Sequence, residues 1–210
     1  MEVKDEIFYH CQRKNGLNKN WEIGDFINFS KKTENYYFSS LKECVLELKN
    51  SLSNIDLNPK IEKIEGIIHN EEFEKNIREK QILINNSKYY IDQINDYFNK
   101  TIQFQQETIF EFIRKEINPQ LPSRQSCIWI TETIEDLRKW SDMFKCPTIL
   151  KLKLNGKIHK TSGKFIDIIQ NRDLYTARLN ATEYWRGKYN DRDEIEFLFE
   201  GNFEIVDKIK

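Results

Sequence analysis

Two glutamates near residue 195 combine an ionisable side chain with a useful spacing. The segment 193–206 reads DEIEFLFEGNFEIV, in which isoleucine and phenylalanine alternate with polar residues. This period of two predicts a strand with one apolar face, and it places Glu194 and Glu196 side by side on the other face. Two carboxylates on a rigid strand can act on one substrate. Glutamates are more often found on a solvated strand surface, so the spacing alone leaves both interpretations open.

Residues that could assist these carboxylates lie on two other predicted strands. The early run EIFYHC predicts a strand that carries His10. In the run 121–131, LPSRQSCIWIT, Arg124 stands at a strand entrance, and Ser126 and Trp129 occupy opposite faces of the strand that follows. A lone histidine near a strand end is usually structural or exposed, so His10 by itself indicates little.

The elements that must position these residues follow an α+β order. Strands are predicted at 6–11, 126–130, 149–154, 166–169, 174–179 and 193–206. The dipeptides Asn155-Gly156 and Gly201-Asn202 are typical of tight turns, so we expect a hairpin at the first and a hairpin or a bulged strand at the second. These strands predict a small, split, mostly antiparallel sheet built from both ends of the chain.

Between 39 and 118 the pattern changes to a helical period. Apolar residues recur three and four positions apart until Pro119 ends the pattern. This block is predicted to be a helical insertion within a single domain that spans 1–210. A shorter helix is predicted to begin at Thr133, which forms a capping box with Asp136.

The segment 181–188, ATEYWRGK, is predicted to be a loop just before the glutamate strand. It would expose Tyr184, Trp185 and Arg186 as a surface that binds a macromolecular target, because aromatic and arginine side chains are enriched in recognition surfaces. A hydrophobic anchor for the loop is an equally good interpretation.

Composition argues against several classes of protein. Lys and Arg number 33 against 34 Asp and Glu, so no overall charge attracts nucleic acid or an anionic membrane. No apolar run reaches the length of a membrane span, and the first residues do not resemble a secretory signal. The four cysteines form no C-x-x-C pair and the three histidines lie in unrelated contexts, so we expect no metal site and a reducing, cytoplasmic environment.

The order of these segments resembles the ADP-ribosyltransferase superfamily. The pieces IFYHCQR, PSRQSCIWIT and EIEFLFEG are similar to an uncharacterised prokaryotic domain family that is grouped with it. The resemblance omits the helical block. It implies a small split sheet with a histidine or arginine on the first strand, a central hydroxyl or aromatic residue, and a glutamate on a late strand.

The resemblance implies a role for each matching residue. His10 matches a histidine that hydrogen-bonds a ribose hydroxyl of NAD, and Trp129 lies near a tyrosine that stacks on nicotinamide, although it lacks the phenol. Alternatively, Ser126 matches the serine of an arginine-serine-glutamate subgroup. In that case His10 departs from the pattern of the subgroup. Glu196 matches the late-strand glutamate, and Glu194 gives the two-residue spacing of members that modify guanidinium groups.

The chemistry that this resemblance implies is NAD-dependent ADP-ribosyl transfer, with NAD as substrate and no metal. Cleavage of the bond between nicotinamide and ribose builds positive charge on the ribose, which a fixed carboxylate stabilises. A second carboxylate orients or deprotonates the acceptor, and Arg124 would meet the diphosphate. We expect loss of Glu196 to abolish turnover with little effect on stability, because a strand-face carboxylate would be solvated.

The acceptor would be a protein or a nucleic acid, as for a toxin or phage-conflict effector that has a neutralising partner protein. The alternative is a non-catalytic protein-interaction domain on the same fold. In that case Tyr184, Trp185 and Arg186 form part of the partner surface and the glutamates are ordinary solvated residues. A nucleic-acid-binding module is less favoured because positive and negative charges balance.

Overall fold

The computed structural model describes residues 1–13, 18–30, 34–53, 70–138, 148–167, 173–190 and 194–209. The chain divides into two compact units, one made of 1–41 with 103–210 and the other of 42–102. All of the described strands belong to the first unit. The second unit contains parts of two helices.

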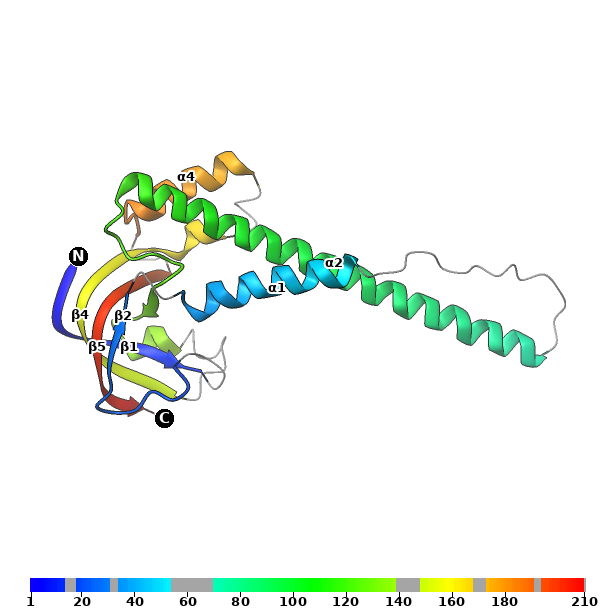
Figure 1. The fold of residues 1–210 in the computed structure, drawn as a ribbon, viewed down its shortest axis with the longest axis horizontal. Coiled ribbons are helices and arrows are strands. Elements are labelled where there is room, and N and C mark those ends of the chain that lie inside the picture. The colour runs from blue at the N-terminus through cyan, green and yellow to red at the C-terminus, as the bar shows by residue number, and fades with distance from the viewer. Residues whose placement is uncertain are drawn as a thin grey trace. The chain divides into compact units, whose positions relative to one another are not determined.

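Five strands form one sheet in the first unit (Figure 1). They are β1 (Glu2–Gln12), β2 (Phe26–Phe29), β3 (Ile128–Ile130), β4 (Thr148–Ser162) and β5 (Ile195–Ile209). Their pairings are antiparallel in the order β1-β4-β5-β2, and β3 also pairs with β5. A backbone bridge between Tyr9 and Thr131 joins β1 to the end of β3. The expectation of an α+β chain with a mostly antiparallel sheet is confirmed.

Strands β4 and β5 each continue through a glycine where a turn was expected. Gly156 and Gly201 face each other across the ladder. A Cβ at Gly156 would lie 2.4 Å from the Glu200 carbonyl oxygen, and one at Gly201 would lie 2.5 Å from that of Asn155. The glycines therefore allow a close backbone approach within two strongly curved strands (Figure 1), and the predicted hairpins are wrong. A register shift leaves Val206 as an extra residue, so the bulged-strand alternative is correct.

Two long helices account for the described part of the predicted helical block. Helix α1 spans Tyr36–Ser53 and α2 spans Asn70–Ile117. The predicted cap at Thr133 is present, because its hydroxyl accepts the Asp136 N–H at 3.1 Å. None of the described helices is both long and apolar enough to cross a bilayer.

The strand predicted at 174–179 is instead the first half of α4 (Leu174–Trp185). The Asp173 side chain begins this helix by accepting the Thr176 N–H at 2.8 Å. Burial follows a helical spacing, since Ala177 and Ala181 are both covered while the leucine and tyrosine that begin the helix are exposed. The strand predicted at 166–169 is also wrong at its start, because Ile166 ends a short 3-10 helix, η1 (Gly163–Ile166), and 168–172 lie outside the described residues.

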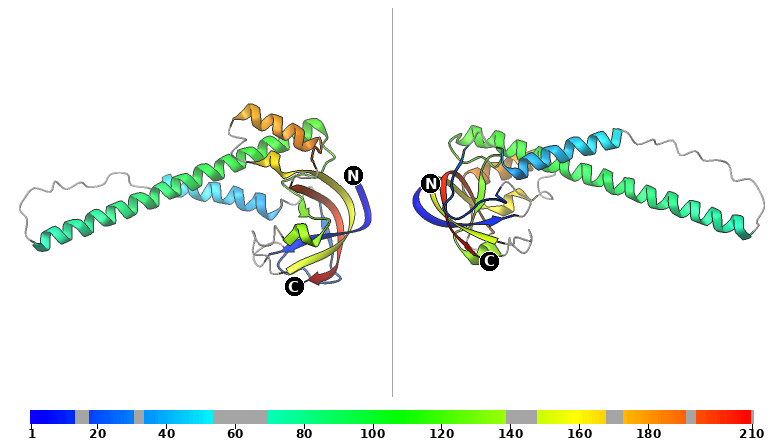
Figure 2. Two further views of the ribbon diagram at one scale, coloured as in Figure 1. Left: turned by 180° about the vertical axis from the view of Figure 1, so that it is seen from behind. Right: turned by 60° about the horizontal axis from the view of Figure 1, so that its bottom comes forward.

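Both faces of β5 are covered. Its odd-numbered phenylalanines join an apolar cluster with side chains of β1, β2 and β4. Leu198, on the other face, packs with Phe110 of α2 and with Ala181 and Trp185 of α4. Figure 2 shows α4 beside the C-terminal part of α2. Because Glu196 shares its face with Leu198, the predicted outer face of the glutamate strand lies under helices.

Candidate functional site

A cavity of about 400 Å³ lies in the first unit, within the range of small-molecule sites. The polar and aromatic residues that line it include His10, Asn18, Trp21, Tyr37, Arg124, Trp129, Glu194 and Glu196. The fold thus gathers both predicted catalytic glutamates and three of the four residues predicted to bind NAD. These residues come from β1, β3, the start of α1, the start of β5 and the segments beside these elements, which are far apart in sequence.

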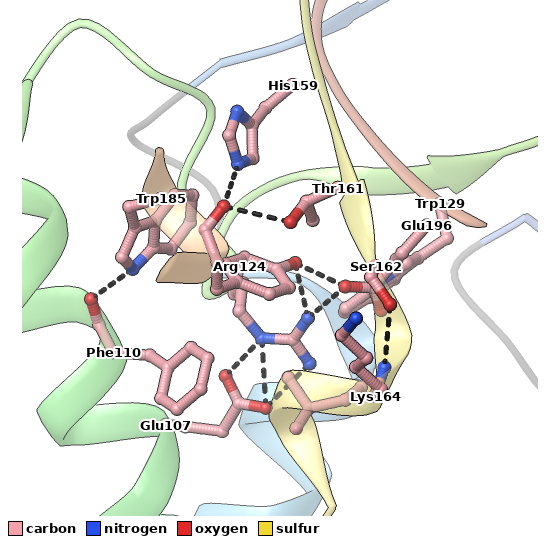
Figure 3. A network of polar contacts seen from close by, with 12 residues as sticks. Glu107, Phe110, Arg124, Trp129, His159, Thr161, Ser162, Lys164, Trp185 and Glu196 are labelled. Carbon is pink, nitrogen blue, oxygen red and sulfur yellow. Dashed lines mark hydrogen bonds and ion pairs between the residues drawn. The ribbon is translucent and has the colours of Figure 1, made fainter. Parts of the chain in front are cut away.

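Glu196 is buried, with 3% of its surface exposed. Its Oε1 accepts a hydrogen bond from the indole N–H of Trp129 at 2.8 Å. Its Oε2 accepts one from Nη1 of Arg124 at 2.5 Å and another from the Tyr184 hydroxyl (Figure 3). The predicted solvated position of Glu196 is therefore wrong, and we now expect its loss to lower stability, because buried donors would be left without a partner.

Arg124 is the centre of this buried network and is 4% exposed. Its Nε and Nη2 each donate to the Glu107 carboxylate at 2.9 Å, and its Nη1 donates to the Tyr184 hydroxyl at 2.7 Å and to Glu196. Burial lowers the pKa of Arg124, but the charges of Glu107 and Glu196 outweigh it and hold the pKa well above the usual value. The guanidinium therefore binds protein groups. It is not the exposed guanidinium that was expected to bind a diphosphate.

Tyr37, which was not predicted as a site residue from the sequence, forms an aromatic wall of the cavity. It lies in the first turn of α1, where the Asn35 side chain caps the helix by accepting the Phe38 N–H at 2.9 Å. Its ring meets that of Trp129 edge-on, with centroids 5.8 Å apart and planes at 85°. Partial burial, then the charge of Glu107, raises the pKa of Tyr37 to about 12, although 37% of the residue remains exposed. The cap signal at Asn35 could have placed Tyr37 at a helix start.

His10 lines the cavity with both ring nitrogens already bonded. Its Nδ1 donates to the Trp129 carbonyl at 2.7 Å, and its Nε2 accepts from the Asn18 amide at 2.9 Å. These partners require a neutral ring with its proton on Nδ1. Burial, assisted by the charge of Arg13, lowers the pKa of His10 from 6.5 to about 4. The predicted ribose contact therefore has no open ring nitrogen in this arrangement.

Glu194 differs from Glu196 in exposure, although both line the cavity. It directly precedes β5 and is exposed to solvent. Its carbonyl accepts the Gly163 N–H at 2.8 Å, which fixes the backbone beside η1. One carboxylate of the pair is therefore buried and bonded, and the other is accessible.

Other predicted site residues lie outside the cavity lining. Ser126 is buried and does not line the cavity. Tyr184 and Trp185 end α4 with exposed fractions of 0% and 2%, so the predicted recognition surface is wrong for both. Arg186, the residue that follows, is exposed. Tyr184 has a different role from the one predicted, because its hydroxyl is a direct partner of Glu196.

The half-buried His10 and the buried His159 predict that the folded state loses stability as the pH falls from 6.5 to 4. His159 donates to the Tyr184 carbonyl at 2.9 Å, and burial lowers its pKa, like that of His10, to about 4. The unfolded chain protonates both rings near pH 6.5 and therefore binds more protons in this window. Each histidine should contribute up to about 1.4 kcal/mol of destabilisation for each pH unit.

Urea denaturation measured across this pH range checks the prediction. The variant His159→Gln should show a visibly shallower dependence of the free energy of unfolding on pH than the wild type. Equal slopes for the two proteins would contradict a neutral, buried His159. The comparison isolates the histidine from the carboxyl groups, which titrate in both proteins.

Two further observations concern the surroundings of the cavity. Cys11 lines it and is disulfide-bonded, which is not the state expected in a reducing cytosol.

Within the described ranges, no group of three or more His, Cys, Asp or Glu side chains is arranged to hold a metal ion.

The family model described as "Protein of unknown function (DUF2441)" matches residues 8–210. The match includes every residue of the site described above, from His10 to Glu196. No curated protein matches the chain.

Proposed function

This chain belongs to the DUF2441 family, whose description names no activity, and from its own site we propose that it is an NAD-dependent ADP-ribosyltransferase. NAD supplies ADP-ribose, and the acceptor is a protein or a nucleic acid. The proposal includes the ADP-ribosyltransferase type of sheet. It is supported by a small antiparallel sheet whose last strand begins at a carboxylate pair. A protein with this activity would act as a toxin or a phage-conflict effector.

The observation that carries the proposal is the pairing of two carboxylates of opposite environment in one cavity lined by aromatic rings. In the reaction, the bond between the ribose C1′ and the nicotinamide nitrogen breaks, and its electron pair leaves with nicotinamide. Positive charge then develops on the ribose. A carboxylate that is already oriented stabilises this charge without reorganisation, which is the largest single contribution in many enzymes.

Glu196 fits the stabilising role because its position is fixed and one acceptor site remains. A carboxylate has about four lone-pair positions, and three of those of Glu196 are used by Trp129, Arg124 and Tyr184. The remaining position is on Oε1, which accepts only the indole N–H among the described donors. A ribose hydroxyl bound there would lie against a carboxylate held from three sides.

Glu194 fits the second role, that of a base for the acceptor. The acceptor nucleophile forms its new bond to C1′ and must give up a proton, which an accessible carboxylate can take. Glu194 is exposed and lines the same cavity, so a macromolecular acceptor can reach it. The interaction-domain alternative depended on Tyr184 and Trp185 as exposed contacts, and both are buried.

The test is release of free nicotinamide from NAD by the purified protein, measured by chromatography with and without cell extract. Release that increases with extract, together with transfer of labelled ADP-ribose to a macromolecule, is the expected result. NAD should also raise the melting temperature, because it binds the folded state. No release and no shift in melting temperature would reject the proposal.

A further inference from the structure

Asn18 lines the cavity, yet the proposed chemistry gives it no role. Its Nδ2 donates to the Cys11 carbonyl at 2.7 Å and to Nε2 of His10 at 2.9 Å, and its Oδ1 accepts the Arg13 N–H at 3.2 Å. The two backbone groups set the orientation of the amide, because a carbonyl only accepts and a backbone N–H only donates. Asn18 therefore presents an N–H to His10.

The backbone of Asn18 is held as well as its side chain. Nε2 of Gln12 donates to the carbonyls of Asn18 and Trp21, each at 2.9 Å. Both Asn18 and Gln12 are 7% exposed. The amide that faces His10 is thus fixed by β1 and by Arg13, which follows it, and needs no ligand to hold it in place.

His10 connects Asn18 to the carboxylate site. Its Nδ1–H donates to the Trp129 carbonyl at 2.7 Å, next to the backbone bridge that joins β1 to β3. The indole N–H of the same Trp129 donates to Oε1 of Glu196 at 2.8 Å. Asn18 is therefore linked to Glu196 by the hydrogen bonds of His10 to the Trp129 backbone and of the Trp129 indole to the carboxylate, with the covalent structure of Trp129 between them.

We propose that Asn18 and His10 are positioning residues that hold Trp129, and through it the Glu196 carboxylate, and that neither contacts the ribose of NAD. A neutral imidazole offers one donor and one acceptor, and both are used by the protein. A ribose hydroxyl would reach Nε2 only by displacing the buried Asn18 amide. The role in catalysis rests on the proposed function, whereas the hydrogen-bond arrangement does not.

Nitrogen-15 NMR of the intact chain with labelled histidine tests the arrangement at neutral pH. The chain has three histidines, and the resonances that disappear in His10→Gln identify those of His10. We expect Nδ1 of His10 to be protonated, Nε2 to be unprotonated, and both to stay unchanged when NAD is added. Asn18→Asp replaces the donor with an acceptor, so Nε2 should gain a proton in that variant.

Three spectral outcomes would overturn the proposal: a protonated or averaged Nε2 in the wild type, a selective shift of Nε2 on addition of NAD, or an unchanged Nε2 in Asn18→Asp. The spectra of the wild type and of Asn18→Asp are recorded without NAD, so their interpretation does not depend on whether the protein is an active enzyme. If the protein turns over no NAD, the proposed function fails, and these two spectra still decide the arrangement of the pair.

Kinetics test the positioning role in the reaction. Asn18→Ala should lower kcat about five- to tenfold, the size of one net hydrogen bond, with the KM for NAD unchanged. Asn28→Ala, at an exposed position of β2, is the matched control and should leave both constants unchanged. A raised KM with an unchanged kcat in Asn18→Ala would overturn the proposal, because it would show that the pair binds ground-state NAD.

Discussion

Replacing Arg124 with methionine is expected to lower the free energy of unfolding by about 3–5 kcal/mol, the usual result of removing one partner from a buried ion pair. The guanidinium lies between the carboxyl groups of Glu107 and Glu196, and all three residues are at most 5% exposed. Methionine keeps much of the volume but leaves both carboxyl groups without their counter-ion. Urea denaturation at neutral pH measures the loss.

A matched pair of variants separates this buried network from ordinary surface charge. Arg186→Met removes an arginine whose side chain is 59% exposed and paired with Glu183, so it should change stability by less than about 1 kcal/mol. The double variant Glu107→Gln with Arg124→Met should recover part of the loss, because one uncompensated carboxylate is removed. A loss below about 1 kcal/mol in Arg124→Met would contradict the network.

The variant Glu194→Gln is expected to reduce nicotinamide release in the presence of acceptor by about 10²- to 10⁴-fold, the usual contribution of a general base. Its free energy of unfolding should stay within about 0.5 kcal/mol of the wild-type value, because the side chain is exposed. Glu196→Gln should lose activity as well, but with about 1–3 kcal/mol of stability, since it disturbs buried hydrogen bonds. The two glutamates therefore differ in their effect on the melt.

Glu132→Gln is the control for this pair, because Glu132 is exposed and pairs with Lys160 outside the cavity lining. Its release rate and its melt should equal those of the wild type. Full activity in Glu194→Gln would remove that residue from the chemistry. Chromatography of nicotinamide and a thermal melt on each protein are sufficient to decide whether Glu194 takes part in the reaction.

Features that depend on a few neighbouring residues were predictable from the sequence. The alternation around Glu196 predicted a strand, and Thr133 predicted a helix cap; both are present. The partners of Glu196 were not predictable, because Arg124 lies 72 positions away and a second carboxylate, Glu107, lies 17 positions before that arginine. Arg124 was identified as a site residue, yet its geometry with respect to Glu107 cannot be read from local spacing.

Glycine shows why some local signals gave the wrong element. The same freedom from a side chain permits a tight turn and a close approach of two strands. At Gly156 and Gly201 the partner strand decides between them, and that partner lies 45 positions away. Burial of the glutamate face was hidden for a related reason, because the sequence does not show that α4 packs over Leu198.

The position of β5 in the sheet has a consequence for how the chain folds during synthesis. β2 and β3 have β5 as their ladder partner among the described strands, and β1 pairs with β4, whose residues follow it by more than a hundred positions. A nascent chain that has not yet reached residue 195 therefore presents open strand edges and an incomplete core. Sheet closure has to wait for 195–209 to leave the ribosome, and we expect folding to be slow because the paired strands are far apart in sequence.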